Sequence, residues 1–179
     1  MRNIYKQTVL LIVPALILLS GCARYIPLKG TYPNIKMPVV IERPTEAVWT
    51  NLIEFLASTG TGIRTIDKAS GLIVTDIYSF KGTVTYEDRT GKPVEADDWV
   101  VCSRFDVASN DALISSQTIA AGPTSVTGNI TIHIVPVGEK TSLSIYLVNL
   151  TANGQKGQQF EAKSTGKLER QFIDILSKE

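Results

Sequence analysis

The chain has 179 residues, with 18 lysines and arginines, 17 acidic residues and one histidine, and its formal net charge is +1. This balance provides no polybasic patch of the kind that nucleic-acid binding requires, so we expect no nucleic-acid partner. It also does not favour recruitment to anionic lipids by charge alone.

The N-terminal residues follow the order of a processed export signal. Arg2 and Lys6 form a short positive segment, and an apolar run of 12 residues follows at positions 8–19. A helix that spans a bilayer needs about 20 residues, so this run suits a signal peptide better than a membrane anchor. We predict that residues 1–21 are removed by cleavage between Gly21 and Cys22.

The segment Leu19-Ser20-Gly21-Cys22 resembles the lipobox of bacterial lipoproteins. The resemblance implies a diacylglyceryl group on the thiol of Cys22 and an acyl chain on its freed amine. Stable anchoring takes two chains, and this cysteine would carry three. Ala23 follows where an aspartate often marks inner-membrane retention, which favours the outer membrane and a domain facing the periplasm. An ordinary secretory signal with a chance cysteine, or a short anchor helix, is the alternative.

Residues 22–38 are predicted to be the lipidated cysteine and a tether. Three prolines and a glycine interrupt any periodicity, which indicates a partly extended segment. Its apolar side chains either pack on the domain or at lipid headgroups, which we favour, or bind a partner: Tyr25, Ile26, Tyr32 and Ile35.

Residues 39–179 are predicted to form one α+β domain. A strand at 39–42 precedes a helix that opens at Pro44 with Thr45 as its N-cap and Glu46 in its first turn, and that ends at the glycines near residue 60. Strands are expected at 63–68, 72–80, 83–86 and 99–107. The polar segment 87–98 and the segment 108–127 read as loops, the latter with one weak strand.

The clearest predicted hairpin joins strands 129–137 and 142–150 through a turn at 138–140. A closing helix follows, with an apolar stripe at Leu168, Phe172, Ile173, Ile175 and Leu176. Its solvated complement is predicted to be Glu161, Lys163, Lys167, Glu169, Arg170 and Asp174. Two helices against an antiparallel sheet make a two-layer, helix-grip-like domain.

Three segments resemble the helix-grip domains of the lipoprotein component C (NlpB) of the outer-membrane β-barrel assembly machinery. They are Val48-Trp49-Thr50-Asn51-Leu52, then Ile63-Arg64-Thr65-Ile66-Asp67, then the hairpin with the closing helix. The resemblance implies a helix-grip fold and an envelope protein partner. That family has a long N-terminal segment that wraps a partner and two such domains in tandem, whereas here the tether has about 16 residues and one domain follows.

The sequence offers few catalytic groups, and we expect no enzyme, cofactor or metal site. His133 is predicted to lie on the solvent-facing side of its strand, without the companions of a metal site or triad. Cys102 lies in an apolar strand and is expected to be a small buried residue rather than a disulfide partner of Cys22 or a nucleophile. An acidic group could hold calcium through oxygen ligands, but a solvated loop is the favoured interpretation: Glu87, Asp88, Glu95, Asp97 and Asp98.

The preferred function is therefore a lipid-anchored, non-catalytic envelope module that binds a protein partner or supports assembly at the outer membrane. The alternative is a carrier of a small apolar ligand between the sheet and the last helix. The residues that could line such a cavity are Phe80, Trp99, Phe105, Phe160 and Phe172. A hydrolase that uses His133 is the third hypothesis.

Overall fold

The computed structural model describes residues 23–32, 35–108, 118–155 and 157–178. It confirms the α+β class, with mostly antiparallel strands and two helices. The described residues divide into two compact units. Unit 1 contains 23–26, 105–108 and 118–121, and unit 2 contains the rest.

Unit 1 is a small sheet with the order β1-β8-β9. Its strands are β1 (Ala23–Ile26), β8 (Arg104–Ala108, whose first residue belongs to unit 2) and β9 (Thr118–Ala121). β8 and β9 are antiparallel from Phe105 opposite Ala121, and the rings of Tyr25 and Phe105 lie 5.3 Å apart. The sequence pattern predicted an irregular tether at residues 22–38, whereas residues 23–26 form the strand β1.

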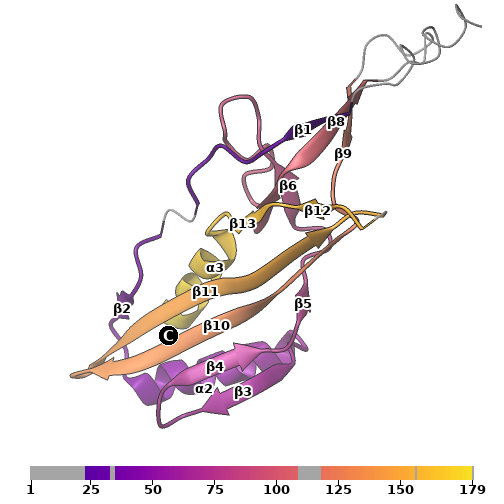
Figure 1. The fold of residues 1–179 in the computed structure, drawn as a ribbon. Coiled ribbons are helices and arrows are strands. Elements are labelled where there is room, and N and C mark those ends of the chain that lie inside the picture. Colours follow the sequence, from indigo (N-terminus) through magenta and orange to yellow (C-terminus); the bar gives the residue numbers. More distant parts are fainter. Residues whose placement is uncertain (1–22, 33–34, 109–117, 156, 179) are drawn as a thin grey trace, which may run out of the picture. The chain divides into compact units, whose positions relative to one another are not determined.

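Unit 2 is built on a sheet with the order β12-β11-β10-β4-β3, and Figure 1 shows the long β10–β11 hairpin in orange. β2 also pairs with β11, and β5 with β10. The strands are β2 (Val39–Ile41), β3 (Ile63–Asp67), β4 (Leu72–Thr75), β5 (Tyr78–Ser79), β10 (Ser125–Val137), β11 (Lys140–Asn153) and β12 (Gln159–Phe160). The predicted hairpin is confirmed, with Gly138 at a φ of 63° in its tight turn.

In Figure 1, α2 (Thr45–Ser58) lies behind β3 and β4, and α3 (Lys167–Ser177) lies beside and partly behind β11. The alternation of apolar residues along the hairpin explains this layer, because one face is buried: Ile130, Ile132, Ile134, Leu143 and Ile145. The helices also meet each other, since the rings of Phe55 and Phe172 pack edge to face at 5.0 Å.

The prediction that Thr45 caps α2 is wrong. Pro44 is the N-cap, with extended backbone angles and no side-chain bond to the helix. The Thr45 hydroxyl instead accepts a 3.3 Å hydrogen bond from the hydroxyl of Thr141 in β11. At the other end, Gly60 adopts a φ of 67°, and the N–H of Thr61 reaches back to the carbonyl of Leu56 as in a Schellman cap.

A third sheet has the order β13-β7-β6, made of β6 (Val84–Tyr86), β7 (Val100–Cys102) and β13 (Ala162–Ser164). β6 and β7 are parallel, which corrects the prediction of an entirely antiparallel sheet. The connection between them is long enough to allow a parallel crossover. The predicted strand 99–107 is broken at Ser103, which exchanges two hydrogen bonds with Glu161.

Candidate functional site

The residues predicted to carry the lipid and the cleavage site, Gly21 and Cys22, lie outside the described residues. Cys102 is buried and free of disulfide, as expected, and burial raises the pKa of its thiol to about 12. Because the thiolate is the nucleophilic form, Cys102 stays unreactive near neutral pH.

His133 is exposed on the outer side of the sheet, as predicted, and its Nε2 lies 3.0 Å from the carbonyl oxygen of Ser70. Within the described ranges, no group of three histidine, cysteine or acidic residues has the geometry of a metal site. The structure therefore does not bring the acidic residues of segment 87–98 together around a cation.

Those acidic residues have separate contacts. Lys167 contacts Asp97 at 2.8 Å and lowers the pKa of that carboxyl. Burial and two neighbouring carboxylates raise the pKa of Asp98. Asp88 is exposed and accepts hydrogen bonds from Thr90 and from the backbone of Lys92, and these bonds lower its pKa.

Glu87 is the exception, and it corrects the prediction of a solvated acidic loop. Its side chain is 5% exposed, and its two carboxylate oxygens accept the backbone N–H groups of Lys29 and Gly30, each at 2.7 Å. Tyr32 donates to the carbonyl of Gly91 at 2.8 Å, and Leu28 reaches Glu161 at 3.4 Å. Residues 28–32, called the strap below, are thus held on unit 2 by acceptors from two loops.

The strap lies within the predicted tether, so its docking was missed from the sequence. Burial, followed by the charge of Glu87, raises the pKa of Tyr32 to about 12, which keeps its phenol a donor. Gly30 is required for this contact, because a Cβ there would lie 2.5 Å from the carbonyl oxygen of Gly91. The sequence feature that comes closest to indicating this docking is the spacing Gly-x-Tyr at residues 30–32, but that spacing alone does not show which residues the strap contacts.

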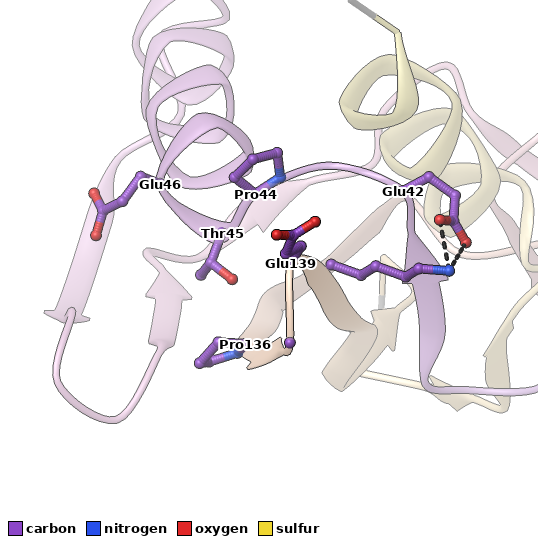
Figure 2. A pocket seen from close by; sticks show the side chains of 8 residues that line it. Glu42, Pro44, Thr45, Glu46, Pro136 and Glu139 are labelled. Carbon is purple, nitrogen blue, oxygen red and sulfur yellow. Dashed lines mark hydrogen bonds and ion pairs between the residues drawn. The ribbon is translucent and has the colours of Figure 1, made fainter.

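An open groove lies where the start of α2 meets the β10–β11 turn (Figure 2), with a volume of about 600 Å³. Its lining is acidic, with Glu42, Glu46 and Glu139 from different segments. Lys140 pairs with Glu42 at 2.7 Å, and Lys68 pairs with Glu46 at 2.6 Å. Exposed ion pairs of this kind contribute about 1 kcal/mol or less to stability, because solvent screens the charges. These two pairs therefore add little to the stability of the fold.

A second hollow of about 310 Å³ shares Thr45, Glu46 and Pro136 with this groove and extends to Trp49, which is 8% exposed. The two hollows form a shallow surface at one end of unit 2. Polar groups surround the indole of Trp49 in these hollows. Such a shallow, polar surface is better suited to contact with another protein than to binding a small molecule.

A small aromatic pocket lies between the two helices and the sheet. Its lining is Phe55, Thr59, Thr61, Tyr78, Trp99, Ile130, Leu168, Gln171 and Phe172, and its volume is about 60 Å³. Two of the five predicted cavity residues, Trp99 and Phe172, line it. Phe80 is instead fully buried. The volume is well below the roughly 300–1,000 Å³ of typical ligand sites.

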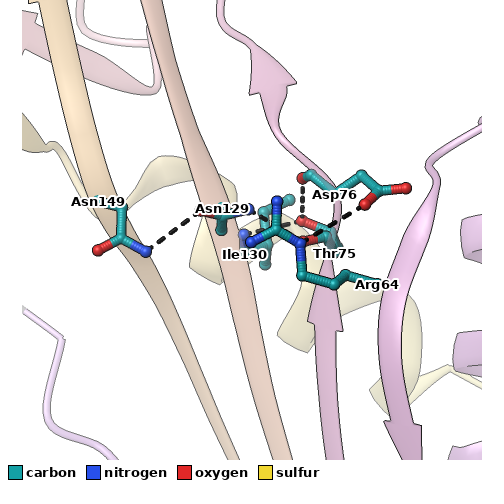
Figure 3. A network of polar contacts seen from close by, with 6 residues as sticks. All are labelled: Arg64, Thr75, Asp76, Asn129, Ile130 and Asn149. Carbon is teal, nitrogen blue, oxygen red and sulfur yellow. Dashed lines mark hydrogen bonds and ion pairs between the residues drawn. The ribbon is translucent and has the colours of Figure 1, made fainter.

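A polar network links the neighbouring strands β11, β10 and β4 near the point where β4 ends (Figure 3). The amide of Asn129 donates to the carbonyl of Thr75 at 3.0 Å and accepts from Asn149 at 3.2 Å. The hydroxyl of Thr75 accepts the backbone N–H of Ile130 at 2.9 Å. These bonds replace the ladder where the predicted strand 72–80 is interrupted, which gives the network a structural role.

Glu169 corrects another prediction, because it is 2% exposed instead of solvated. Ser164 donates to it at 2.7 Å, and its other carboxylate oxygen has no partner among the described residues. Burial raises the pKa of this carboxyl, against smaller lowering contributions from Ser164 and the backbone N–H of Leu147. The sequence pattern placed Glu169, which follows Leu168, on the polar face of the helix, so its burial was not predicted.

Comparison with known proteins finds no family model that matches the chain and no matching curated protein. Within the part of the chain that the structure describes, neither helix has the length and apolar character needed to cross a bilayer.

Proposed function

We propose that this protein is a lipid-anchored, non-catalytic envelope lipoprotein that acts as a protein-interaction or assembly accessory module at the outer membrane, facing the periplasm. One observation carries the proposal: the carboxylate of Glu87 holds the backbone of Lys29 and Gly30, only seven and eight positions after the cysteine that ends the lipobox.

The position of the strap along the chain supports a domain that stays close to its anchor. Lys29, whose backbone Glu87 holds, lies seven positions after Cys22. At about 3.5 Å per residue, this distance is at most roughly 25 Å. A lipid on Cys22 places unit 2 within reach of proteins embedded in the same membrane.

The fold proposed for unit 2 is a helix grip. The support is that α3 buries Leu168, Phe172 and Leu176 against the sheet layer that α2 also covers. The resemblance to the lipoprotein component of the β-barrel assembly machinery extends this proposal to an envelope protein partner. A fold alone does not define a role, so the partner requires direct evidence.

The interaction role is favoured over the carrier alternative by the size of the aromatic pocket. A space of about 60 Å³ accommodates roughly two water molecules, at about 30 Å³ each, and is too small for a lipid chain. Exposed apolar side chains on the outer sheet face also suit contact with a protein: Val40, Val135 and Tyr146.

The test is crosslinking and co-purification of the intact protein from its own membranes, with Cys22→Ala as the control. The proposal expects specific envelope proteins to be captured with the parent chain and to be depleted with the Cys22→Ala variant. Capture of the same proteins at equal yield by both forms would show that the anchor has no part in the interaction. Capture of no specific protein would contradict the interaction role.

A further inference from the structure

The strap contact has the character of peptide recognition. Two successive backbone N–H groups, from Lys29 and Gly30, point to one buried carboxylate, and both distances are 2.7 Å. Charge-assisted bonds of this kind are stronger than bonds between neutral groups. The side chains of Lys29 and Thr31 are exposed, so the contact reads the main chain more than the side chains.

The surface beneath the strap is rich in acceptors. It presents the carboxylate of Glu87, the carbonyl of Gly91 and the carboxylate of Glu161. Arg104 donates to the backbone carbonyl of Glu87 at 2.7 Å and so fixes the loop that carries this carboxylate. We call this surface the strap groove.

The strap groove also selects for shape. Gly30 and Gly91 approach so closely that a Cβ on Gly30 would collide with the Gly91 carbonyl. Two residues later, the Tyr32 hydroxyl donates to that same carbonyl. A segment that fits therefore has glycine followed, at the second position, by tyrosine.

We propose that the strap groove is a peptide-binding site, occupied in cis by residues 28–32, that accepts an extended Gly-x-Tyr segment of a partner protein when the strap leaves. The cis segment competes at an effective concentration of the order of millimolar, so it acts as an autoinhibitory contact. This inference rests on the proposed interaction role and names the partner's chemistry, but it does not depend on the lipid on Cys22.

The experiment uses the purified full chain in mild detergent and measures amide hydrogen exchange. Glu87→Gln places an amide donor against one of the two strap N–H groups, so exchange in residues 28–32 is expected to rise about tenfold or more. Two variants serve as matched controls and should leave this exchange unchanged. Glu139→Gln changes an exposed carboxylate in the turn between β10 and β11, and Thr31→Val changes an exposed side chain within the strap. Equal exchange in the parent and in Glu87→Gln would overturn the proposal.

The second measurement supplies the ligand in trans. The probe is a capped synthetic peptide of residues 27–32, Pro-Leu-Lys-Gly-Thr-Tyr. It should bind the Gly30→Val variant, whose own strap cannot dock, and protect the amides of the loop at 87–93. It should bind the parent at least tenfold more weakly, and the Gly30→Val, Glu87→Gln double variant not at all.

Absence of peptide binding to Gly30→Val, with unchanged exchange in β10 and β11, would overturn the proposal. If Gly30→Val raises exchange throughout the hairpin, the variant is unfolded. In that case the trans test is made on Tyr32→Phe, which removes one donor of the cis strap and leaves Glu87 and Gly91 unchanged, and binding of added peptide is again required. Either failure leaves the co-purification test of the anchored module unaffected, because neither measurement involves Cys22.

Discussion

Ser164 donates a 2.7 Å hydrogen bond to Glu169 at the start of α3, while the second carboxylate oxygen of Glu169 is buried with no partner among the described residues. Burial of one unpaired carboxylate oxygen is costly when the group is ionised. Burial therefore favours the protonated acid and outweighs the Ser164 hydrogen bond, in agreement with the raised pKa of Glu169.

This pair predicts a pH dependence of stability. Because the folded pKa of Glu169 is raised, its contribution is fully present below the unfolded value of 4.5 and is lost as pH rises through the folded value. Glu169→Gln keeps the acceptor for Ser164 and cannot ionise. The free energy of unfolding of the parent, relative to this variant, should thus fall between about pH 4 and about pH 7.5.

Chemical denaturation at both pH values measures the difference. The control is Asp174→Asn, which removes an exposed carboxyl from the same helix. A parent and a Glu169→Gln variant with the same pH dependence would show that this carboxyl titrates alike in the folded and unfolded chains.

Tyr32 predicts a second pH effect, at the alkaline end. Its pKa is raised from 10.0 to about 12, so its stabilising contribution is complete below pH 10 and is lost as pH rises through about 12. Burial also raises the pKa of Tyr86, so an absorbance titration of the phenols should show more than one late-titrating group, and Tyr32→Phe should remove one of them. The Thr31→Val variant, which keeps the phenol, should retain that group. Loss of an early-titrating group in Tyr32→Phe would contradict the docked position.

Asn149 is expected to be sensitive to the shape of its backbone. Its φ is 54°, at the irregularity where β10 and β11 shift register, and it bonds to Asn129. Asn149→Ala should lose the hydrogen bond and strain the left-handed backbone, at a cost of about 2 kcal/mol. Asn149→Gly should lose only the bond, about 1 kcal/mol or less, in urea unfolding. Equal losses would contradict a left-handed residue here.

Phe172 is expected to be the main contact between the two helices. It is 3% exposed and packs against Phe55, so Phe172→Ala should lower the free energy of unfolding by about 3–5 kcal/mol. Ile175→Ala, on the exposed side of the same helix, is the matched control and should cost less than about 1 kcal/mol. Guanidinium unfolding of both variants distinguishes a packed helix from a loosely attached one.

The regular elements of unit 2 were largely predictable because their patterns are local. Alternation in β10 and β11, and apolar spacing in α2 and α3, follow from burial of one face. The pattern could not separate β4 from β5, because the interruption depends on Asn129, which is 54 residues away from its partner Thr75. The parallel pairing of β6 and β7 is likewise a long-range choice.

The polar residues that organise the candidate site were not predictable, for the same reason. Glu87 and Glu169 belong to classes that are mostly exposed, and each is buried only because distant segments cover it. By contrast, the exposure of His133 followed from its place in the alternating pattern of β10, and the burial of Cys102 from its apolar neighbours in β7. The segment that resembles a lipobox is contiguous in sequence, so the proposal of lipidation at Cys22 rests on no feature of the fold.

The most direct test of the account is the intact mass of the mature N-terminal peptide, isolated from membranes of cells that make the full chain. The account predicts a peptide that begins at Cys22 and carries a diacylglyceryl group and an amide-linked acyl chain, and predicts that Cys22→Ala leaves the chain unlipidated. A mature chain that begins at any other residue, or an unmodified Cys22 in the membrane-bound protein, would contradict the central claim.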